Sequence, residues 1–444
     1  MPLMHHEHKE IMPVWGEYVL VVVFLAALAV PGIMVAAGWS VPTSNTENRR
    51  LAELPEFAVK TFYTAPFRRS FESYLNDHFG FRNVLVGWHL RMYVKWFKTV
   101  PIRGVAVHQT ATDQAPTIPT AETPTLPDAD EVVQPATNTS QTNTAQPEPQ
   151  PETLPREHVT IETNAILGKD GWYFYSAGTT IDDYRATQPL SDAELKTIAD
   201  NIIKTKDDLA AQGIAFYVMA APDKHTIYGE YMPDIYNRVG PLTRLDQTIQ
   251  YLEQHTDITI IDPRADLLAA KPASRLYEKT GTHWNEYGAY IGYRALLRAI
   301  QKDFPAISIP SIEDFTIKTQ IAGGADLAIM LSLQEDLQEE QIKLIPKAPR
   351  QAVNASFAFE NPNPDPEKSV LAKEITASDL PRLLMFRDSF TNAMAPFISE
   401  NFSRSVFIRN YPIDQTIVEI EQPDVVVLEF VERQLYDALY IGLK

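Results

Sequence analysis

The 444-residue sequence contains no cysteine. This absence excludes disulfide bonds, catalysis by a thiol and metal sites built from thiolates. It does not indicate a compartment, because exported bacterial proteins also lack cysteine in many cases.

Motifs for nucleotide and zinc binding are also absent. The sequence has no G-x-G-x-x-G, no P-loop and no H-E-x-x-H, so we expect no cofactor and no metal. Basic residues are the minority charge, with 39 Lys and Arg against 57 Asp and Glu, a net charge of -18 and a pI near 5.0. This balance argues against nucleic acid as a general partner, although it is compatible with a local basic groove.

Charge is missing altogether from Tyr18 to Trp39, and residues 20–30 are continuously apolar. Roughly 20 such residues span a bilayer as a helix, so we predict one transmembrane helix over 18–39 after a short N-terminus, 1–17. A cleaved signal peptide is the alternative, because Val35-Ala36-Ala37 suits a signal peptidase. The preceding residues form a poor positive region, which favours a retained anchor.

The segment 40–108 carries helical patterns. Phe67, Phe71, Tyr74 and Leu75 have the spacing of one helix face, and residues 84–97 repeat the pattern. We therefore predict two helices that pack on a later domain.

Between about residues 109 and 156 the composition shifts to Pro, Thr, Gln, Ala and acidic residues. Such a segment cannot bury enough apolar surface to offset its ordering entropy, which predicts disorder. Composition alone does not decide between a linker and an insertion.

The remainder, 157–444, alternates strands with helices. A hairpin is predicted around Lys169-Asp170-Gly171, and a helix from the capping box at Ser191 to Gly213. Predicted buried strands cover 214–220, 258–261, 383–386, 405–408 and 424–429. The pattern predicts an α/β fold with a mainly parallel sheet flanked by helices and with functional residues beyond the strand ends.

Ser389 follows one of these strands and precedes a predicted helix. A serine at this place has backbone N–H groups and the positive helix end beside it, as a nucleophile with an oxyanion site requires. The alternative is that Asp388 or Ser389 only caps the helix.

His283 is the candidate base. It stands in polar loop sequence just before a helix that Asn285 is expected to cap, which suits an exposed general base. A structural histidine is the alternative interpretation.

Six motifs, in order, resemble the alginate O-acetyltransferase family of AlgJ and AlgX, whose domain is similar to SGNH hydrolases. They are Glu47-Asn48-Arg49, Gly168-Lys169-Asp170-Gly171-Trp172, Pro222-Asp223-Lys224, Thr282-His283-Trp284-Asn285, Asp388-Ser389-Phe390 and Glu429-Phe430-Val431-Glu432-Arg433. The resemblance implies one SGNH-like domain built from 40–108 and 157–444, with 109–156 as an insertion. It also implies a single-pass inner-membrane protein whose N-terminus is cytoplasmic and whose domain is periplasmic.

A Ser-His-Asp triad carries the chemistry of that family. By resemblance Ser389 is the nucleophile and His283 the base, but the acid's position is occupied by Gly281. Glu278, Asp326 and Asp388 are candidates for the missing carboxylate. A further expectation is that three residues contact substrate: Arg387, Trp284 and Lys224.

The expected function is O-acetylation of a secreted polysaccharide through a serine acyl-enzyme, with a polytopic membrane acyltransferase as acetyl donor partner. An acetyl esterase that uses the same Ser-His pair is one alternative. A non-catalytic polysaccharide-binding assembly subunit is another, and Gly281 is the feature that favours it.

Overall fold

The computed structural model describes residues 164–363, 370–376 and 378–443, together with 64–77 and isolated positions at 18, 43–44, 49–50, 52–53, 55, 88 and 91–92. The expected transmembrane segment 18–39, apart from Tyr18, and the expected disordered segment 109–156 lie outside the described residues, as does almost all of the expected helix 84–97. Within the described part of the chain, no helix is both long and apolar enough for a bilayer crossing.

In the N-terminal part, the helix expected around Phe67 is present as α2 (Ala65–Asp77). Phe67 and Tyr74 are buried, and the Phe67 and Phe71 rings stack with centroids 5.9 Å apart. A two-residue ladder precedes it, between β1 (Thr43–Ser44) and β2 (Arg49–Arg50).

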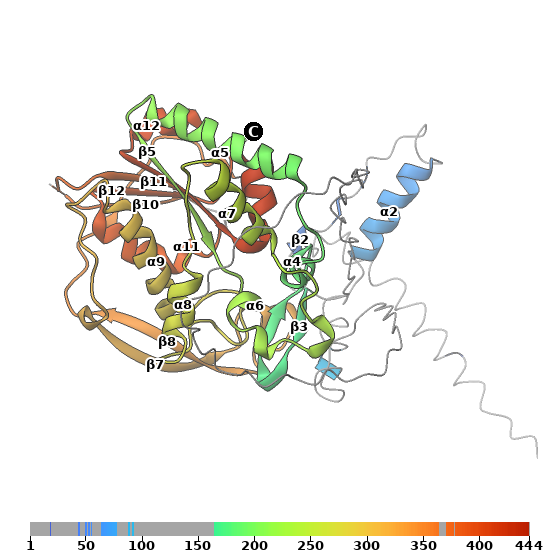
Figure 1. Ribbon diagram of the computed structural model, residues 1–444. Helices are drawn as coiled ribbons and strands as arrows, with labels where there is room; N and C mark the ends of the chain where they lie inside the picture. Colours follow the sequence, from blue (N-terminus) through green and yellow to red (C-terminus); the bar gives the residue numbers. More distant parts are fainter. Residues whose placement is uncertain are drawn as a thin grey trace, which may run out of the picture.

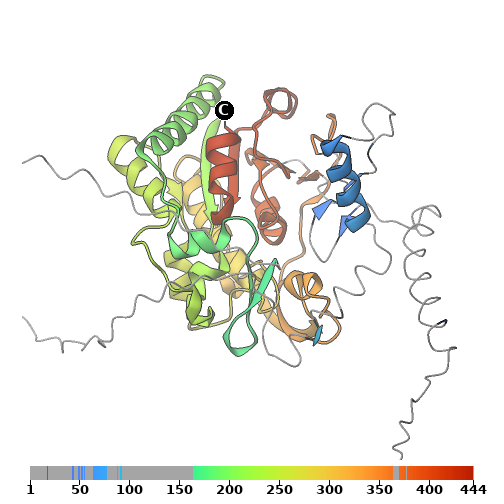
Figure 2. The ribbon, with the colours of Figure 1, turned by 90° about the vertical axis from the view of Figure 1, so that its right-hand side faces the viewer.

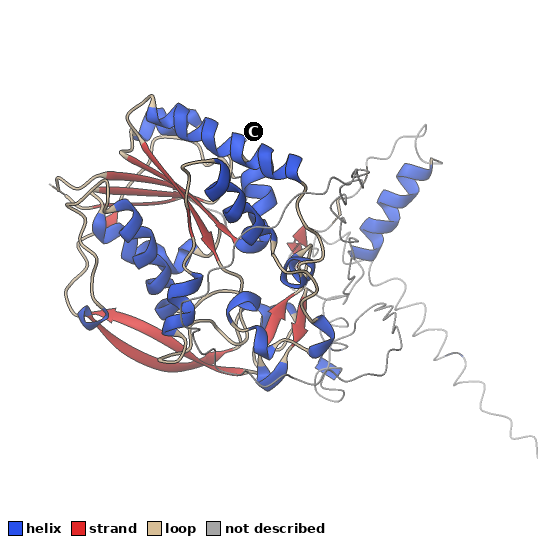
Figure 3. Ribbon diagram, in the orientation of Figure 1, coloured by secondary structure: helices blue, strands red, loops and turns tan. Residues whose placement is uncertain are grey.

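The centre of the molecule is a seven-stranded sheet (Figures 1 and 3). In spatial order its strands are β6 (Ile260–Ile261), β5 (Ala215–Ala221), β13 (Val425–Val431), β11 (Arg382–Phe386), β12 (Arg404–Ile408), β10 (Leu371–Glu374) and β9 (Val353–Asn354). The first five strands run parallel, and β10 and β9 are added antiparallel. The predicted mainly parallel α/β fold is therefore confirmed.

Helices cover both faces of this sheet (Figure 1). One face carries α5 (Asp192–Ala210), α7 (Arg244–His255) and α12 (Gln415–Glu421), and the other carries α8 (Arg264–Ala270), α9 (Glu286–Ile300) and α11 (Thr391–Ile398). Every residue of β13 is buried, and its side chains alternate between two apolar clusters: Val427 joins one, and Leu428 the other. Burial on both faces explains why the central strands read as unbroken apolar runs.

The caps expected from sequence form as predicted. The Ser191 hydroxyl accepts from the Glu194 N–H while Glu194 accepts from the Ser191 N–H, and Asn285 accepts from the Gly288 N–H at the start of α9. A C-terminal π-helical turn, Tyr436–Ile441, lies beside α5 (Figure 2), where Asn201 donates to the Leu439 carbonyl. This contact ties the C-terminal segment to the first long helix of the domain.

Besides the β1–β2 ladder, the described residues form two longer hairpins outside the central sheet. The predicted one joins β3 (Ala165–Leu167) to β4 (Tyr173–Tyr175) through Lys169–Gly171, where Asp170 and Gly171 have positive φ. The second, which the sequence did not lead us to expect, pairs β7 (Phe315–Gly323) with β8 (Gln338–Pro346) and carries α10 (Asp326–Met330) between them. Short helices α4 (Thr180–Arg185) and α6 (Lys224–Ile227) complete the part around the site.

Candidate active site

Ser389 lies in the turn between β11 and α11, at the carboxyl edge of the parallel strands. Asp388 braces this turn, because its carboxylate accepts from the Phe390 N–H (2.8 Å), the Val431 N–H (2.6 Å) and the Tyr411 hydroxyl (3.1 Å). Glu429 of the neighbouring strand accepts from the Asp388 N–H at 3.2 Å. The serine is thus held by the end of β13 as well as by its own strand.

Glu429 is fully buried, and it also accepts from the Thr391 hydroxyl at 2.7 Å. Burial first, and then the nearby charge of Asp388, raise its pKa well above the ordinary range of a glutamate. Its other oxygen has no partner among the described residues. The raised pKa favours the neutral acid, and the two hydrogen bonds that Glu429 accepts hold the turn at Asp388 and the first residue of α11.

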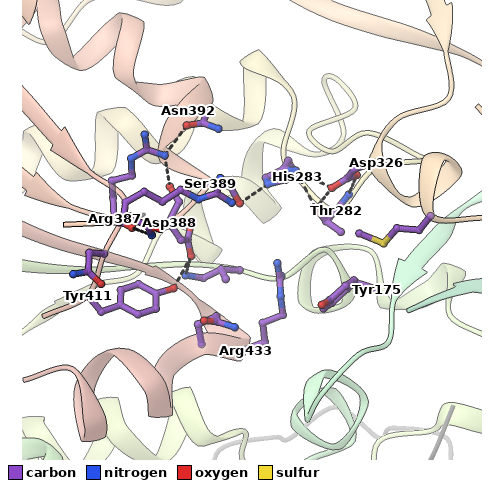
Figure 4. Close-up of a pocket in the computed structure, with 16 residues that line it drawn as sticks. Tyr175, Thr282, His283, Asp326, Arg387, Asp388, Ser389, Asn392, Tyr411 and Arg433 are labelled. Carbon is purple, nitrogen blue, oxygen red and sulfur yellow. Dashed lines mark hydrogen bonds and ion pairs between the residues drawn. The ribbon is translucent and has the colours of Figure 1, made fainter. Parts of the chain in front are cut away.

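His283 lies opposite Ser389, with its Nε2 atom 2.8 Å from the Ser389 Oγ (Figure 4). The loop that carries it is held on both sides. Trp284 is buried and donates from its indole N–H to the Phe390 carbonyl at 2.9 Å, and Asn285 caps α9. The two segments named in the sequence as nucleophile and base, 106 residues apart, are thus brought into direct hydrogen-bond contact.

Asp326, at the start of α10, supplies the carboxylate beside the histidine (Figure 4). Its Oδ2 is 3.2 Å from the His283 Nδ1 and accepts from the Thr282 hydroxyl at 2.5 Å. The Thr282 oxygen is 2.9 Å from the same Nδ1. Because the single hydroxyl hydrogen of Thr282 goes to Asp326, the Nδ1 must carry the hydrogen that Thr282 and Asp326 accept. The Nε2 then keeps the lone pair that a base for Ser389 requires.

The absence of a side chain at Gly281 leaves room for the Asp326 carboxylate beside His283. A Cβ atom at Gly281 would meet the Asp326 Oδ1 at 2.9 Å and the Ala325 Cβ at 3.0 Å. The Asp326 carboxylate therefore occupies the space that an aspartate side chain at position 281 would take. Its Oδ1 is held there by the N–H groups of Thr282 (2.7 Å) and Leu327 (3.0 Å).

The electrostatics of Asp326 favour its charged form. Burial alone would raise its pKa, but hydrogen bonds and charge from His283, together with hydrogen bonds from Thr282, outweigh burial and hold the pKa well below its ordinary value. The favoured charged form is the one that can accept from the Thr282 hydroxyl and from the His283 Nδ1.

The other two candidate acids do not approach the histidine. Asp388 is engaged with Val431 and Tyr411, as described above. Glu278 faces Arg275 and Glu339, and burial together with a hydrogen bond to Glu339 raises its pKa to about 8. Of the three carboxylates proposed from the sequence, the structure places only Asp326 against His283.

Two of the three expected substrate contacts are in the interior. Trp284 is 2% exposed and Lys224 is 1% exposed, and neither lines the cavity at Ser389. The Lys224 ammonium instead donates to the carbonyls of Glu278 (3.0 Å), Lys279 (3.1 Å) and Gly281 (2.5 Å). Both side chains therefore lie outside the lining of this cavity, where they support the loop of His283.

Arg387, the third expected contact, does line the cavity. Its Nη1 donates to the Asp388 carbonyl (2.9 Å) and to the Asn392 Oδ1 (2.6 Å). Because an arginine only donates, this bond fixes the amide of Asn392 with its NH2 group turned away from Arg387.

The cavity has a volume of about 550 Å³ and opens over Ser389, His283 and Asp326 (Figure 4). Residues that the sequence did not single out complete its wall: Tyr175, Met330, Asn363, Asn392, Arg409, Asn410, Tyr411 and Gln434. Arg409 and Tyr411 directly follow β12, so the strand-end rule that identified Ser389 could also have found them.

Residues 165–365 match the family model ALGX, described as the SGNH hydrolase-like domain of acetyltransferase AlgX. No curated protein sequence matches the chain. Similar solved structures include Bacillus cereus PatB1 with a sulfonyl adduct (16% identity, 63% of this chain and 99% of that chain, TM-score 0.46). The O-acetyltransferase domain of Pseudomonas putida AlgJ is 18% identical over 61% of this chain and 92% of that one, with a TM-score of 0.41. Pseudomonas aeruginosa AlgX is 15% identical over 62% and 66%, with a TM-score of 0.38.

The matched segment contains His283 and Asp326 and ends before Ser389. It confirms the resemblance noted in the sequence: residues 165–365 of this chain are similar to the SGNH hydrolase-like domain of acetyltransferase AlgX.

Proposed function

We propose that this protein is an O-acetyltransferase that acetylates hydroxyl groups of a secreted polysaccharide through an acetyl-serine intermediate. The observation that supports this most directly is the continuous series of contacts in the lining of one open cavity: a hydrogen bond of 2.8 Å joins Ser389 to His283, and 3.2 Å separates His283 from the carboxylate of Asp326. A base within reach of a nucleophile, and oriented by a third group, is the arrangement that acyl transfer needs.

In the proposed first step, the Ser389 oxygen attacks the carbonyl carbon of the acetyl donor, and its proton passes to the His283 Nε2. Asp326 stabilises the imidazolium that forms. The departing group takes that proton and leaves an acetyl ester on Ser389. In the second step, a sugar hydroxyl gives its proton to His283 and attacks the ester carbonyl, so that the acetyl group moves to the sugar and Ser389 recovers its proton.

Two groups are suited to hold the oxyanion. The Ser389 N–H has no acceptor among the described residues and lies just before α11. The Asn392 NH2 group is available because Arg387 occupies the amide oxygen. Donors that are fixed before the reaction stabilise developing charge without reorganising.

We further propose that residues 18–39 anchor the protein in the inner membrane with the domain in the periplasm, and that a polytopic membrane acyltransferase delivers the acetyl group. These proposals rest on the uncharged segment and on the family resemblance. The position of Asp326 removes the reason for preferring a non-catalytic subunit, which was the glycine at 281.

The test uses the full chain in detergent with a chromogenic acetyl ester. Ser389→Ala and His283→Ala should each lose about 10³-fold or more of turnover. The matched controls should retain the wild-type turnover. They are Ser403→Ala, just before the start of β12 at the opposite end of the sheet, and His255→Ala at the end of α7. Equal turnover by wild type and Ser389→Ala, with equal acetylation of polymer in cells that carry either form, would overturn the proposal. Appearance of acetylated oligosaccharide, and not merely acetate, separates a transferase from an esterase.

A further inference from the structure

A second cavity of about 250 Å³ adjoins the cavity at Ser389. It lies between the segment after β4, the first turn of α4 and the segment after β13. Three residues line both cavities: Tyr175, Arg433 and Gln434. The two spaces are therefore neighbours across one shared wall, and a ligand long enough to pass that wall can occupy both.

The shared wall is held in a fixed position. Arg433 forms an ion pair with Asp223, and its backbone N–H donates to the same carboxylate at 3.0 Å. Its guanidinium lies 4.9 Å from the centre of the Tyr175 ring and 5.6 Å from that of Phe390. Figure 4 shows Tyr175 and Arg433 across the cavity from Ser389. A preorganised wall lowers the cost of ordering a ligand against it.

The second cavity offers polar groups that are not used elsewhere. Among the described residues, no side-chain hydrogen bond engages Gln434, so its amide is available to both cavities. Tyr436 adds a ring that is kept in place by stacking on Tyr440, with centroids 4.4 Å apart. A planar amide beside a fixed aromatic ring suits a ligand that has hydroxyl groups and an apolar face.

Both arginines that line the second cavity are paired with a carboxylate, Arg244 with Asp183 and Arg433 with Asp223. The exposed Asp437 adds a further negative charge. The cavity at Ser389 differs, because within the described residues neither Arg387 nor Arg409 forms an ion pair with a carboxylate. Among the described residues that line the second cavity, no cation is thus left unpaired for a carboxylate or phosphate ligand, and desolvating such an anion there would be unfavourable.

We propose that the second cavity binds the sugar unit next to the one that is acetylated, and that this neighbouring unit is uncharged. The inference rests on the proposed function and adds to it the minimum length of the acceptor and the charge of one of its units.

The experiment measures acetyl transfer by the full chain from a chromogenic acetyl ester to oligosaccharides of one to six units, with products identified by mass. Neutral β-1,4-linked gluco-oligosaccharides and oligogalacturonides of equal length are compared. We expect kcat/KM for the neutral series to rise about 10-fold or more between one unit and three, the gain of one well-placed additional subsite. Gln434→Ala and Tyr436→Ala should remove most of that rise. Gln212→Ala and Tyr251→Ala are matched controls, since Tyr251 also stacks on the residue four positions later, His255.

The outcomes separate this inference from the proposed function. Transfer that depends on Ser389 but not on acceptor length, or a length dependence that survives both variants, overturns the second subsite and leaves the acetyltransferase intact. If wild type acetylates oligogalacturonides better than neutral oligosaccharides and Gln434→Ala abolishes this preference, the proposal that the neighbouring sugar unit is uncharged is overturned. If no acceptor is acetylated and calorimetry detects no binding of the neutral hexamer, the subsite is rejected. Transfer that persists in Ser389→Ala rejects the proposed function itself.

Discussion

Replacing Asp326 by asparagine should place the hydrogen of His283 on the wrong nitrogen. The N–H groups of Thr282 and Leu327 both point at Oδ1, so an asparagine would keep its amide oxygen there and turn its NH2 group to the Oδ2 position. That NH2 group would donate toward the His283 Nδ1, which would then become an acceptor. The hydrogen moves to Nε2, and the base can no longer take the Ser389 proton.

The expected loss is large. The same change in the triad of a serine protease lowers kcat about 10⁴-fold, which corresponds to roughly 5.5 kcal/mol of transition-state stabilisation. Asp326→Ala should be less damaging than Asp326→Asn, because the Thr282 oxygen, 2.9 Å from Nδ1, can still accept from the correct tautomer. The order of activities is therefore wild type, then alanine, then asparagine.

Ester turnover and nitrogen NMR of the imidazole together test this reasoning. The asparagine variant should show a protonated Nε2 near neutral pH, which a purely structural role of Asp326 would not produce. In the Asp326→Ala background, Gly281→Asp should recover about 10-fold or more, since the atom nearest the new Cβ has been removed. An asparagine variant as active as the alanine variant, with Nδ1 protonated, would refute the argument.

Three further predictions concern the support of the site. Burial and the hydrogen bond to Glu339 raise the pKa of Glu278 to about 8, so its contribution to stability is full below about 4.5 and is lost as the pH rises to about 8. At pH 8 Glu278→Gln should therefore melt about 3 °C or more above wild type in calorimetry, with no such gain at pH 4. Lys224→Met should lower the free energy of unfolding by about 2 kcal/mol or more in urea titrations, because three carbonyl groups lose their donor; an unchanged midpoint would contradict this. Glu429→Gln should keep ester turnover within about 3-fold at pH 7, because the raised pKa of Glu429 favours the neutral acid that glutamine resembles. Glu429→Leu cannot accept from Asp388 and Thr391 and should lose more than 10-fold. Equal losses in the two variants would contradict this reasoning.

The sheet and its reactive edge could be predicted because their signals are local. The runs at 214–220, 383–386 and 424–429 are apolar since both of their faces are covered, and parallel strands gather the residues after their carboxyl ends. The strand-end rule is what points to Ser389 in the sequence, and the cap of the following helix is what points to His283.

The acid could not be chosen from local patterns. Asp326 reaches the histidine because α10 docks on Thr280, whose carbonyl accepts from the Ala328 N–H and whose hydroxyl accepts from the Ala325 N–H. These contacts join segments 45 or more residues apart. The hairpin around α10 also gave no clear signal, because Ile317 and Ile321 of β7 are exposed. Asp388 is a candidate because it is adjacent to Ser389 in the sequence. Its carboxylate, however, accepts from the Val431 N–H at the end of β13 and does not reach His283.

Among the described residues, β7 and β8 form a two-stranded sheet of their own, whereas Ser389 directly follows a central strand of the seven-stranded sheet. The proposed nucleophile and the proposed partner of its base therefore depend on two different sheets, which are joined through the contacts of Thr280. Loosening the contacts of Thr280 would leave a serine that a covalent probe can still label slowly while steady turnover falls. The rate of covalent labelling would then report on Ser389 and its strand, and steady-state turnover would also report on the hairpin. The ratio of the two rates would measure how stably the hairpin packs against the loop of Thr280.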